Sequence, residues 1–129
     1  MSLVFDASAI IRLVELKPDK AVNALRNQYT IDLAYYEIGN YLWRISKLTT
    51  VNVELLLKVF NNVIGFMNVV PIGLNSDVID LARRMNITYY DASYVYLTMK
   101  LNAKLVTEDR ELIAKFPPNI AISVRELQI

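Results

Sequence analysis

The sequence of 129 residues contains neither cysteine nor histidine. Disulfides, thiolate zinc sites, cysteine nucleophiles, Ser-His-Asp triads and imidazole general bases are therefore excluded. Any catalysis must use carboxylates, hydroxyls, lysine or a bound metal. The formal net charge of +1 gives no global basic field of the kind that marks a dedicated nucleic-acid-binding protein. A nucleic-acid substrate would need local positive patches or metal.

Glycine is also scarce, and long apolar runs are absent. The three glycines, Gly39, Gly65 and Gly73, are too far apart to build a P-loop or a G-x-G-x-x-G turn, so we expect no nucleotide cofactor. Residues such as Lys58 and Asn68 interrupt the apolar stretches before they reach the ~18 residues of a membrane-spanning helix. The first residues show no basic region and no small-residue cleavage site. We expect a cytoplasmic protein with no membrane association.

The sequence is nevertheless apolar, with 54% hydrophobic and 21% charged residues. Such a composition indicates a sheet covered on both faces or an apolar surface used for association, and we expect both. The length predicts one domain, residues 1–129.

Short apolar runs alternate with segments of helical periodicity, which predicts an α/β fold with a mostly parallel sheet. Strands are predicted at residues 3–6, 30–34, 69–72, 104–107 and 120–124. Helices are predicted at residues 7–16, 17–28, 35–48, 51–67, 75–85, 86–102 and 108–116, the last of them ended by Pro117 and Pro118.

Four carboxylates follow the predicted strands. Asp6 ends the first strand, Glu37 lies in the first turn of the helix after the second, Asp91 near the start of its helix, and Asp109 just past the fourth strand. Each has a purely structural explanation, because acids cap helices and favour the positive end of the helix dipole. Thr88-x-x-Asp91, for example, has the spacing of a capping box.

Taken together, the four acids support a second interpretation. The carboxyl ends of parallel strands lie on one edge of a sheet, where ligands bind, so we expect the four carboxylates to converge on one cleft there. Crowded carboxylates must be partly protonated or must hold cations. Oxygen ligands without histidine or cysteine favour Mg²⁺ or Mn²⁺.

The remaining acids provide a contrast, because they lie beside polar residues or on helical faces away from the apolar stripe. We interpret them as solvated charges: Asp19, Asp32, Asp77, Asp80, Glu54 and Glu126. Asp6 and Asp91 instead follow "LVF" and "YY", where an isolated charge would be costly without a partner.

Four segments, "VFDASAI", "YYEIGNYL", "YYDASYVYL" and "LVTEDREL", resemble the motifs of PIN domain ribonucleases, and particularly of VapC-type toxins of prokaryotic toxin-antitoxin pairs. The resemblance spans nearly the whole chain. We therefore expect a three-layer α/β/α sandwich with a five-stranded sheet in the order 3-2-1-4-5. In that family the acids bind Mg²⁺ or Mn²⁺ and cut RNA at a phosphodiester bond.

The resemblance also implies roles for individual residues. Four carboxylates become metal ligands and catalytic groups, and three polar side chains support them: Asp6, Glu37, Asp91 and Asp109, with Ser8, Asn40 and Thr107. Ala7 departs from the family, in which many members carry a hydroxyl at this position. Arg12, Arg44 and Arg110 are candidates for holding the RNA backbone, although surface solvation explains them equally well.

Partners follow from the same resemblance. In the family, apolar surfaces receive an antitoxin and a second toxin copy, so we expect a VapB-like antitoxin and a homodimer. The candidate surface is an apolar surplus made of Ile10, Ile11, Val14, Leu16 and Trp43. Burial of the first helix on two sides would explain this surplus equally well.

Other classes of protein share a parallel sheet with an acidic site. A receiver domain would show paired acids after the first strand and a lysine after the last, whereas Asp6 stands alone and Arg125 follows the last strand. A D-x-D phosphatase is excluded because position 8 is Ser8. A housekeeping PIN nuclease in RNA processing and a catalytically silent metal-binding or interaction module both remain open at this point.

Overall fold

The computed structural model describes residues 2–117 and 119–129. Its sheet has five parallel strands in the order β3-β2-β1-β4-β5, which confirms the predicted fold and strand order. The strands are β1 (Leu3–Phe5), β2 (Tyr29–Ile31), β3 (Asn68–Val70), β4 (Lys104–Val106) and β5 (Ala121–Ile122).

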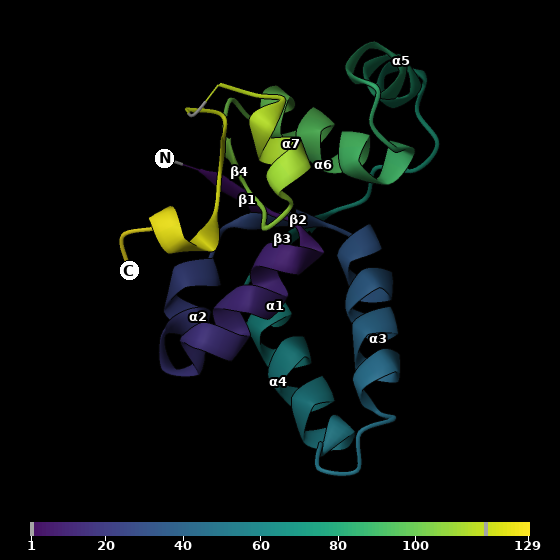
Figure 1. Ribbon diagram of the computed structural model, residues 1–129. Coiled ribbons are helices and arrows are strands. Elements are labelled where there is room, and N and C mark those ends of the chain that lie inside the picture. The colour runs from purple at the N-terminus through teal and green to yellow at the C-terminus, as the bar shows by residue number, and fades with distance from the viewer. Residues whose placement is uncertain (1, 118) are drawn as a thin grey trace.

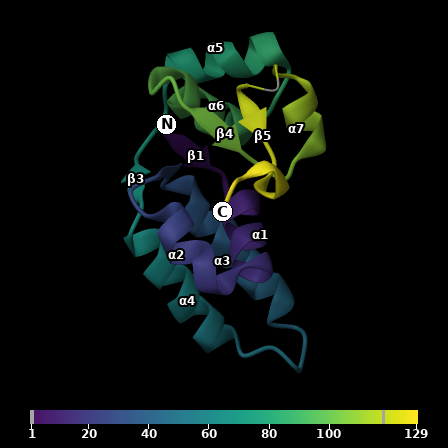
Figure 2. The ribbon, with the colours of Figure 1, turned by 90° about the vertical axis from the view of Figure 1, so that its left-hand side faces the viewer.

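Helices cover both faces of the sheet and complete the three layers (Figures 1 and 2). One layer contains α1 (Ala7–Leu16), α2 (Pro18–Leu25), α3 (Leu33–Ile45) and α4 (Val53–Gly65). The other contains α5 (Ser76–Met85), α6 (Tyr89–Lys100) and α7 (Arg110–Ala114). Within residues 2–117 and 119–129, no helix combines the length and the apolar character needed to cross a membrane.

Two hydrophobic cores lie on opposite faces of the sheet. Phe5 and Val106 pack with the layer of α1 to α4, whereas their neighbours Val4 and Leu105 pack with the layer of α5 to α7. This alternation follows from the two-residue period of a strand. Both faces of the sheet are covered, and most residues of its strands are apolar.

The boundary between β2 and α3 differs from the prediction. The strand ends at Ile31, and α3 begins at Leu33 instead of residue 35. The buried face of the helix explains the difference, because Ala34, Ile38 and Leu42 recur every four residues and face the core together. Glu37 therefore lies in the second turn of α3, and the prediction of a first-turn position is wrong.

The C-terminal elements are shorter than predicted. β5 ends at Ile122, and a 3₁₀ turn, η1 (Val124–Glu126), replaces the rest of the predicted strand. The Glu126 carboxylate accepts a hydrogen bond of 3.2 Å from the Ser123 N–H, which turns the chain. α7 ends at Ala114, before Pro117. The predicted role of Pro118 in ending this helix lies outside the described residues.

The predicted apolar surplus divides into core and surface. Ile10 and Val14 are buried in the core beneath α1, so their assignment to an association surface is wrong. Ile11 is partly buried against the same core. Leu16 and Trp43 are exposed, and only these two of the five remain available to a partner.

Candidate acidic active site

Asp6 is the most buried of the four predicted carboxylates, with 7% of its surface exposed. It follows β1 directly and caps α1, because its Oδ1 accepts the Ala9 N–H at 2.9 Å. The same oxygen accepts the Ser8 hydroxyl at 2.6 Å, and Oδ2 accepts the Thr107 hydroxyl. Burial raises the pKa of Asp6 to about 6 and the Glu37 charge adds to the rise, although these hydrogen bonds oppose it.

The two predicted supporting hydroxyls join the turn after β1 to the turn after β4. The Ser8 Oγ accepts the Glu108 N–H at 3.0 Å, and the Thr107 Oγ1 accepts the Asp109 N–H at 3.1 Å. Thr107 is fully buried. Both hydroxyls therefore fix the position of the Asp6 carboxylate relative to the start of α7.

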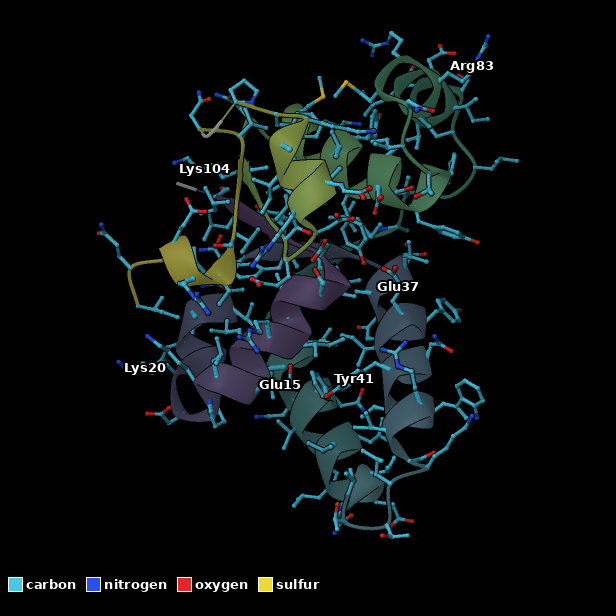
Figure 3. The ribbon with its side chains drawn as sticks, in the orientation of Figure 1. Glu15, Lys20, Glu37, Tyr41, Arg83 and Lys104 are labelled. Carbon is cyan, nitrogen blue, oxygen red and sulfur yellow. The ribbon has the colours of Figure 1, made fainter. Side chains whose placement is uncertain are left out.

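Glu37 projects from the end of α3 that lies nearest the sheet (Figure 3). Its Oε1 accepts a hydrogen bond of 2.7 Å from the Tyr94 hydroxyl of α6. Burial raises the pKa of Glu37 and the charge of Asp91 raises it further, whereas the bond from Tyr94 lowers it.

Tyr94 is a site residue that the sequence analysis missed. It is almost fully buried, and burial together with Glu37 raises the pKa of its hydroxyl, so Tyr94 remains a neutral hydrogen-bond donor. The sequence feature that could have identified Tyr94 is its spacing from Asp91. Residues three apart share one helical face, so Tyr94 lies on the face that carries Asp91.

Asp91 and Asp109 lie at the starts of α6 and α7. The Thr88 hydroxyl accepts the Asp91 N–H at 3.1 Å, so Thr88 caps α6 and leaves the Asp91 carboxylate available. Burial raises the pKa of Asp91, and the charge of Asp109 raises it further. Asp109 does cap its helix, since its Oδ1 accepts the N–H groups of Glu111 at 3.0 Å and Leu112 at 3.3 Å.

Electrostatic repulsion links the four carboxylates in sequence along the edge of the sheet. Glu37 raises the pKa of Asp6, Asp91 raises that of Glu37, and Asp109 raises that of Asp91. Two hollows lie along this edge of the sheet. Glu37 contributes to a hollow of about 440 Å³, and Asp91 and Asp109 contribute to another of about 160 Å³. In the described part of the chain, no three acidic side chains are placed to hold one ion.

The neighbours of these acids supply further polar and basic groups. Asn40 and Arg44 line the same hollow as Glu37. Lys115, which the sequence analysis did not single out, lines the hollow of Asp91 and Asp109 and lowers the pKa of Asp91. Arg12 and Arg110 line neither hollow. The acids that we interpreted as solvated charges are all exposed: Asp19, Asp32, Asp77, Asp80, Glu54 and Glu126.

The donors along this edge suit a hard divalent cation. They are carboxylate, hydroxyl and amide oxygens, which Mg²⁺ and Mn²⁺ prefer. The Glu37 charge also repels the buried charge of Asp6, and a cation between the two carboxylates would offset this repulsion.

The fold and the acidic edge of its sheet describe an α/β protein whose carboxylates gather at the carboxyl ends of parallel strands. The PIN domain family matches residues 4–117 of the chain. Ribonuclease VapC3 of Pyrobaculum aerophilum is 32% identical over 126 residues, which cover 91% of this chain and 96% of that protein. Exonuclease VapC9 of the same organism is 33% identical over 110 residues, covering 85% and 82% respectively. The chain belongs to the PIN domain family, and its resemblance to VapC proteins is confirmed.

Two solved structures agree with this assignment. The crystal structure of PAE2754 from Pyrobaculum aerophilum superposes with a TM-score of 0.84 at 31% identity, covering 97% of this chain and 85% of that one. A toxin-antitoxin complex from Klebsiella pneumoniae gives a TM-score of 0.69 at 15% identity, covering 98% and 100%. The latter likeness concerns the fold alone.

Proposed function

We propose that this protein is a divalent-metal-dependent endoribonuclease and the toxin of a toxin-antitoxin pair. Asp6 carries the proposal, because a buried carboxylate with a raised pKa is held by two hydroxyls beside a second acid at the functional edge of a PIN domain. The name of the relative Ribonuclease VapC3 supports RNA as the substrate. An RNA substrate would place its action in the cytoplasm.

In this proposal Asp6, Glu37, Asp91 and Asp109 hold Mg²⁺ or Mn²⁺ and carry catalysis. A bound divalent ion lowers the pKa of water and stabilises charge on the attacked phosphate. One of these carboxylates can then accept the proton of the attacking water.

The polar neighbours have supporting roles. Ser8 and Thr107 keep the Asp6 carboxylate oriented through their hydroxyls. Asn40 and Arg44, in the hollow beside Glu37, contact the RNA, and the guanidinium of Arg44 binds a backbone phosphate. We also propose a VapB-like antitoxin and a second copy of the chain as partners, with Leu16 and Trp43 available for these contacts.

The mode of cleavage needs a direct test, because the two curated relatives are named a ribonuclease and an exonuclease. A covalently closed circular RNA distinguishes the modes, since it offers no end. We expect Mn²⁺ to support cleavage of circular and linear RNA alike, and a chelator to abolish both. Cleavage of linear RNA alone would exclude an endonuclease.

Two controls complete the test. Asp6→Asn protein purified in parallel should cut neither substrate, which excludes a contaminating nuclease. Co-expression with the product of an adjacent small gene tests the toxin role: a stable complex that suppresses cleavage supports it, and undiminished cleavage with no complex contradicts it.

A further inference from the structure

Each of two acids in the candidate site is preceded by a pair of tyrosines. The segments are Tyr35-Tyr36-Glu37 on α3 and Tyr89-Tyr90-Asp91 on α6. The tyrosine ring is large and mostly apolar, and it is usually largely buried in a folded protein. Tyr36 and Tyr90 are instead 76% and 60% exposed. The metal site does not account for this exposure.

The two exposed tyrosines line the same surface. Together with Leu33 they border both the hollow of Glu37 and a neighbouring hollow of about 210 Å³. The two hollows therefore adjoin, and the rings of Tyr36 and Tyr90 lie where they meet. We refer to Tyr36, Tyr90 and the two hollows as the tyrosine cleft.

Within the described residues, no hydrogen bond fixes the hydroxyl of either tyrosine. The Tyr89 hydroxyl has structural partners, because it donates to the Gly73 carbonyl at 2.6 Å and accepts the Asn75 N–H at 2.9 Å. Among residues 2–117 and 119–129, the hydroxyls of Tyr36 and Tyr90 make no such bonds. Their rings are free to contact a ligand.

Two polar side chains follow Tyr36 along α3. Tyr36, Asn40 and Arg44 are spaced by four residues, so they follow one another on one helical face. All three line the hollow of Glu37. The order along the helix is thus an aromatic ring, an amide and a guanidinium, which are suited to a base face, a base edge and a phosphate.

We propose that the tyrosine cleft binds unpaired nucleotides of single-stranded RNA next to the cleavage point, with bases stacked on Tyr36 and Tyr90. The inference rests on the proposed function, and it assigns the residues that hold the bases of the RNA beside the acidic site. A base in a duplex has both faces covered by its neighbours, whereas an unpaired base can stack on an aromatic ring. Stacking on the two rings tolerates many sequences, since every base has a π-face.

The test measures binding and cleavage separately. A fluorescent twelve-nucleotide single-stranded RNA is titrated with protein in chelator, where cleavage is suppressed, and a hairpin of equal length serves as the duplex probe. Tyr36→Ala and Tyr90→Ala should each weaken single-strand binding about 5- to 150-fold, the effect of losing one stacked base. Tyr→Phe at either position keeps the ring and should bind like the parent.

Matched variants separate stacking from general disturbance. Tyr35 lies next to Tyr36, is 47% exposed and lines neither hollow, so Tyr35→Ala should leave RNA binding unchanged. Tyr96 lines a separate hollow of about 520 Å³ with Arg84 and Lys100, and Tyr96→Ala provides the same control on α6. Leucine at position 36 or 90 retains apolar bulk without a π-face. Tyr36→Leu and Tyr90→Leu should therefore bind RNA as weakly as the alanine variants, and they replace those variants in the test if the alanine variants fold poorly.

The outcomes distinguish this inference from the proposed function. In Mn²⁺ the tyrosine variants should raise KM and leave kcat nearly unchanged. If the parent cleaves RNA, and the alanine and leucine variants bind RNA as tightly as the parent, the inference is overturned and the proposed function stands. Loss of binding in these variants, with no cleavage by the parent in Mn²⁺, would support the inference and contradict the proposed function.

Two further results would overturn the tyrosine cleft as an RNA site. One is a parent protein that does not bind the single-stranded probe. The other is a change of oligomeric state in Tyr36→Ala or Tyr90→Ala by light scattering with RNA affinity intact, which would assign the cleft to a protein partner.

Discussion

The Tyr94 hydroxyl donates a hydrogen bond of 2.7 Å to the Glu37 carboxylate, although 57 residues separate them in the sequence. The bond connects α3 to α6, which belong to opposite layers of the sandwich. It also brings Glu37 within electrostatic reach of Asp91 on the same helix as Tyr94. Tyr94 therefore links Glu37 in one layer to the helix of Asp91 in the other.

Substituting Tyr94 by phenylalanine should raise the pKa of Glu37, because a hydrogen bond to the charged form is lost. Protons would then compete better with a cation. We expect about 1 kcal/mol of lost stability, and a larger loss of the Mn²⁺ effect between pH 8 and pH 6 than in the parent, in which Asp6 already has a pKa of about 6. Thermal melts of both proteins with and without Mn²⁺ at each pH measure this. The same pH dependence of the Mn²⁺ effect in parent and variant would show that Tyr94 does not tune Glu37.

Asp6→Asn should separate stability from activity. In chelator at neutral pH the amide removes a buried charge and still accepts from Ala9 and Ser8, so stability should be kept or raised. The same change weakens a cation site, so RNA cleavage and the stabilisation by Mn²⁺ should both shrink. Melting temperatures in chelator and in Mn²⁺, measured beside cleavage, test both effects. If Asp6→Asn still cleaves RNA, and Mn²⁺ does not shift the melting temperature of the parent, the metal site is contradicted.

The raised pKa of Asp6 predicts how metal-free stability depends on pH. Its pKa rises from 3.8 in the unfolded chain to about 6 in the fold. Between these values the folded state binds more protons than the unfolded state, so stability falls as pH rises. The loss should reach roughly 3 kcal/mol above about pH 6. Urea unfolding of the parent and of Asp6→Asn in chelator, from about pH 4 to 7, should show a smaller slope in the variant, where only the raised pKa values of Glu37 and Asp91 remain.

Much of the fold could be predicted because its signals are local. Strand and helix periods gave the alternation of elements, and the positions of Asp6 and Asp109 after their strands follow directly from it. The start of α3 was harder, because Leu33 and Ala34 suit a buried strand as well as the first turn of a helix. Only the tertiary contact of Ala34 with the core decides between them.

The geometry of the candidate site could be predicted only in part. That Ser8 and Thr107 lie beside Asp6 follows from the family motifs. The bond from Tyr94 to Glu37 depends on the distance between two helices in different layers, which no local pattern specifies. The hollow that each carboxylate lines likewise depends on how elements distant in the sequence are placed in space, which no local pattern specifies.

Thr107 offers a test of how the Asp6 carboxylate is held. Thr107→Val keeps the shape of this buried side chain, but it removes the donor to Asp6 and the acceptor for the Asp109 N–H. We expect a loss of about 1 to 3 kcal/mol and a further rise in the pKa of Asp6. Thr107→Ser retains the hydroxyl and is the matched control. Equal stability and equal pH profiles for the two variants would show that the hydroxyl has no part in holding Asp6.

Asp109 has two roles in this interpretation, and two substitutions can separate them. Its Oδ1 caps α7, and its charge contributes to the acidic edge through Asp91. Asparagine caps a helix about as well as aspartate, so Asp109→Asn should keep stability in chelator within a few tenths of a kcal/mol. Asp109→Ala loses the cap and should cost about 0.5 to 2 kcal/mol with or without metal. If the carboxylate also serves the cation, both variants should reduce RNA cleavage and the Mn²⁺-dependent rise in melting temperature to a similar extent, because both remove the same charge. An Asp109→Asn protein with parental cleavage and a parental response to Mn²⁺ would leave Asp109 with capping as its only role.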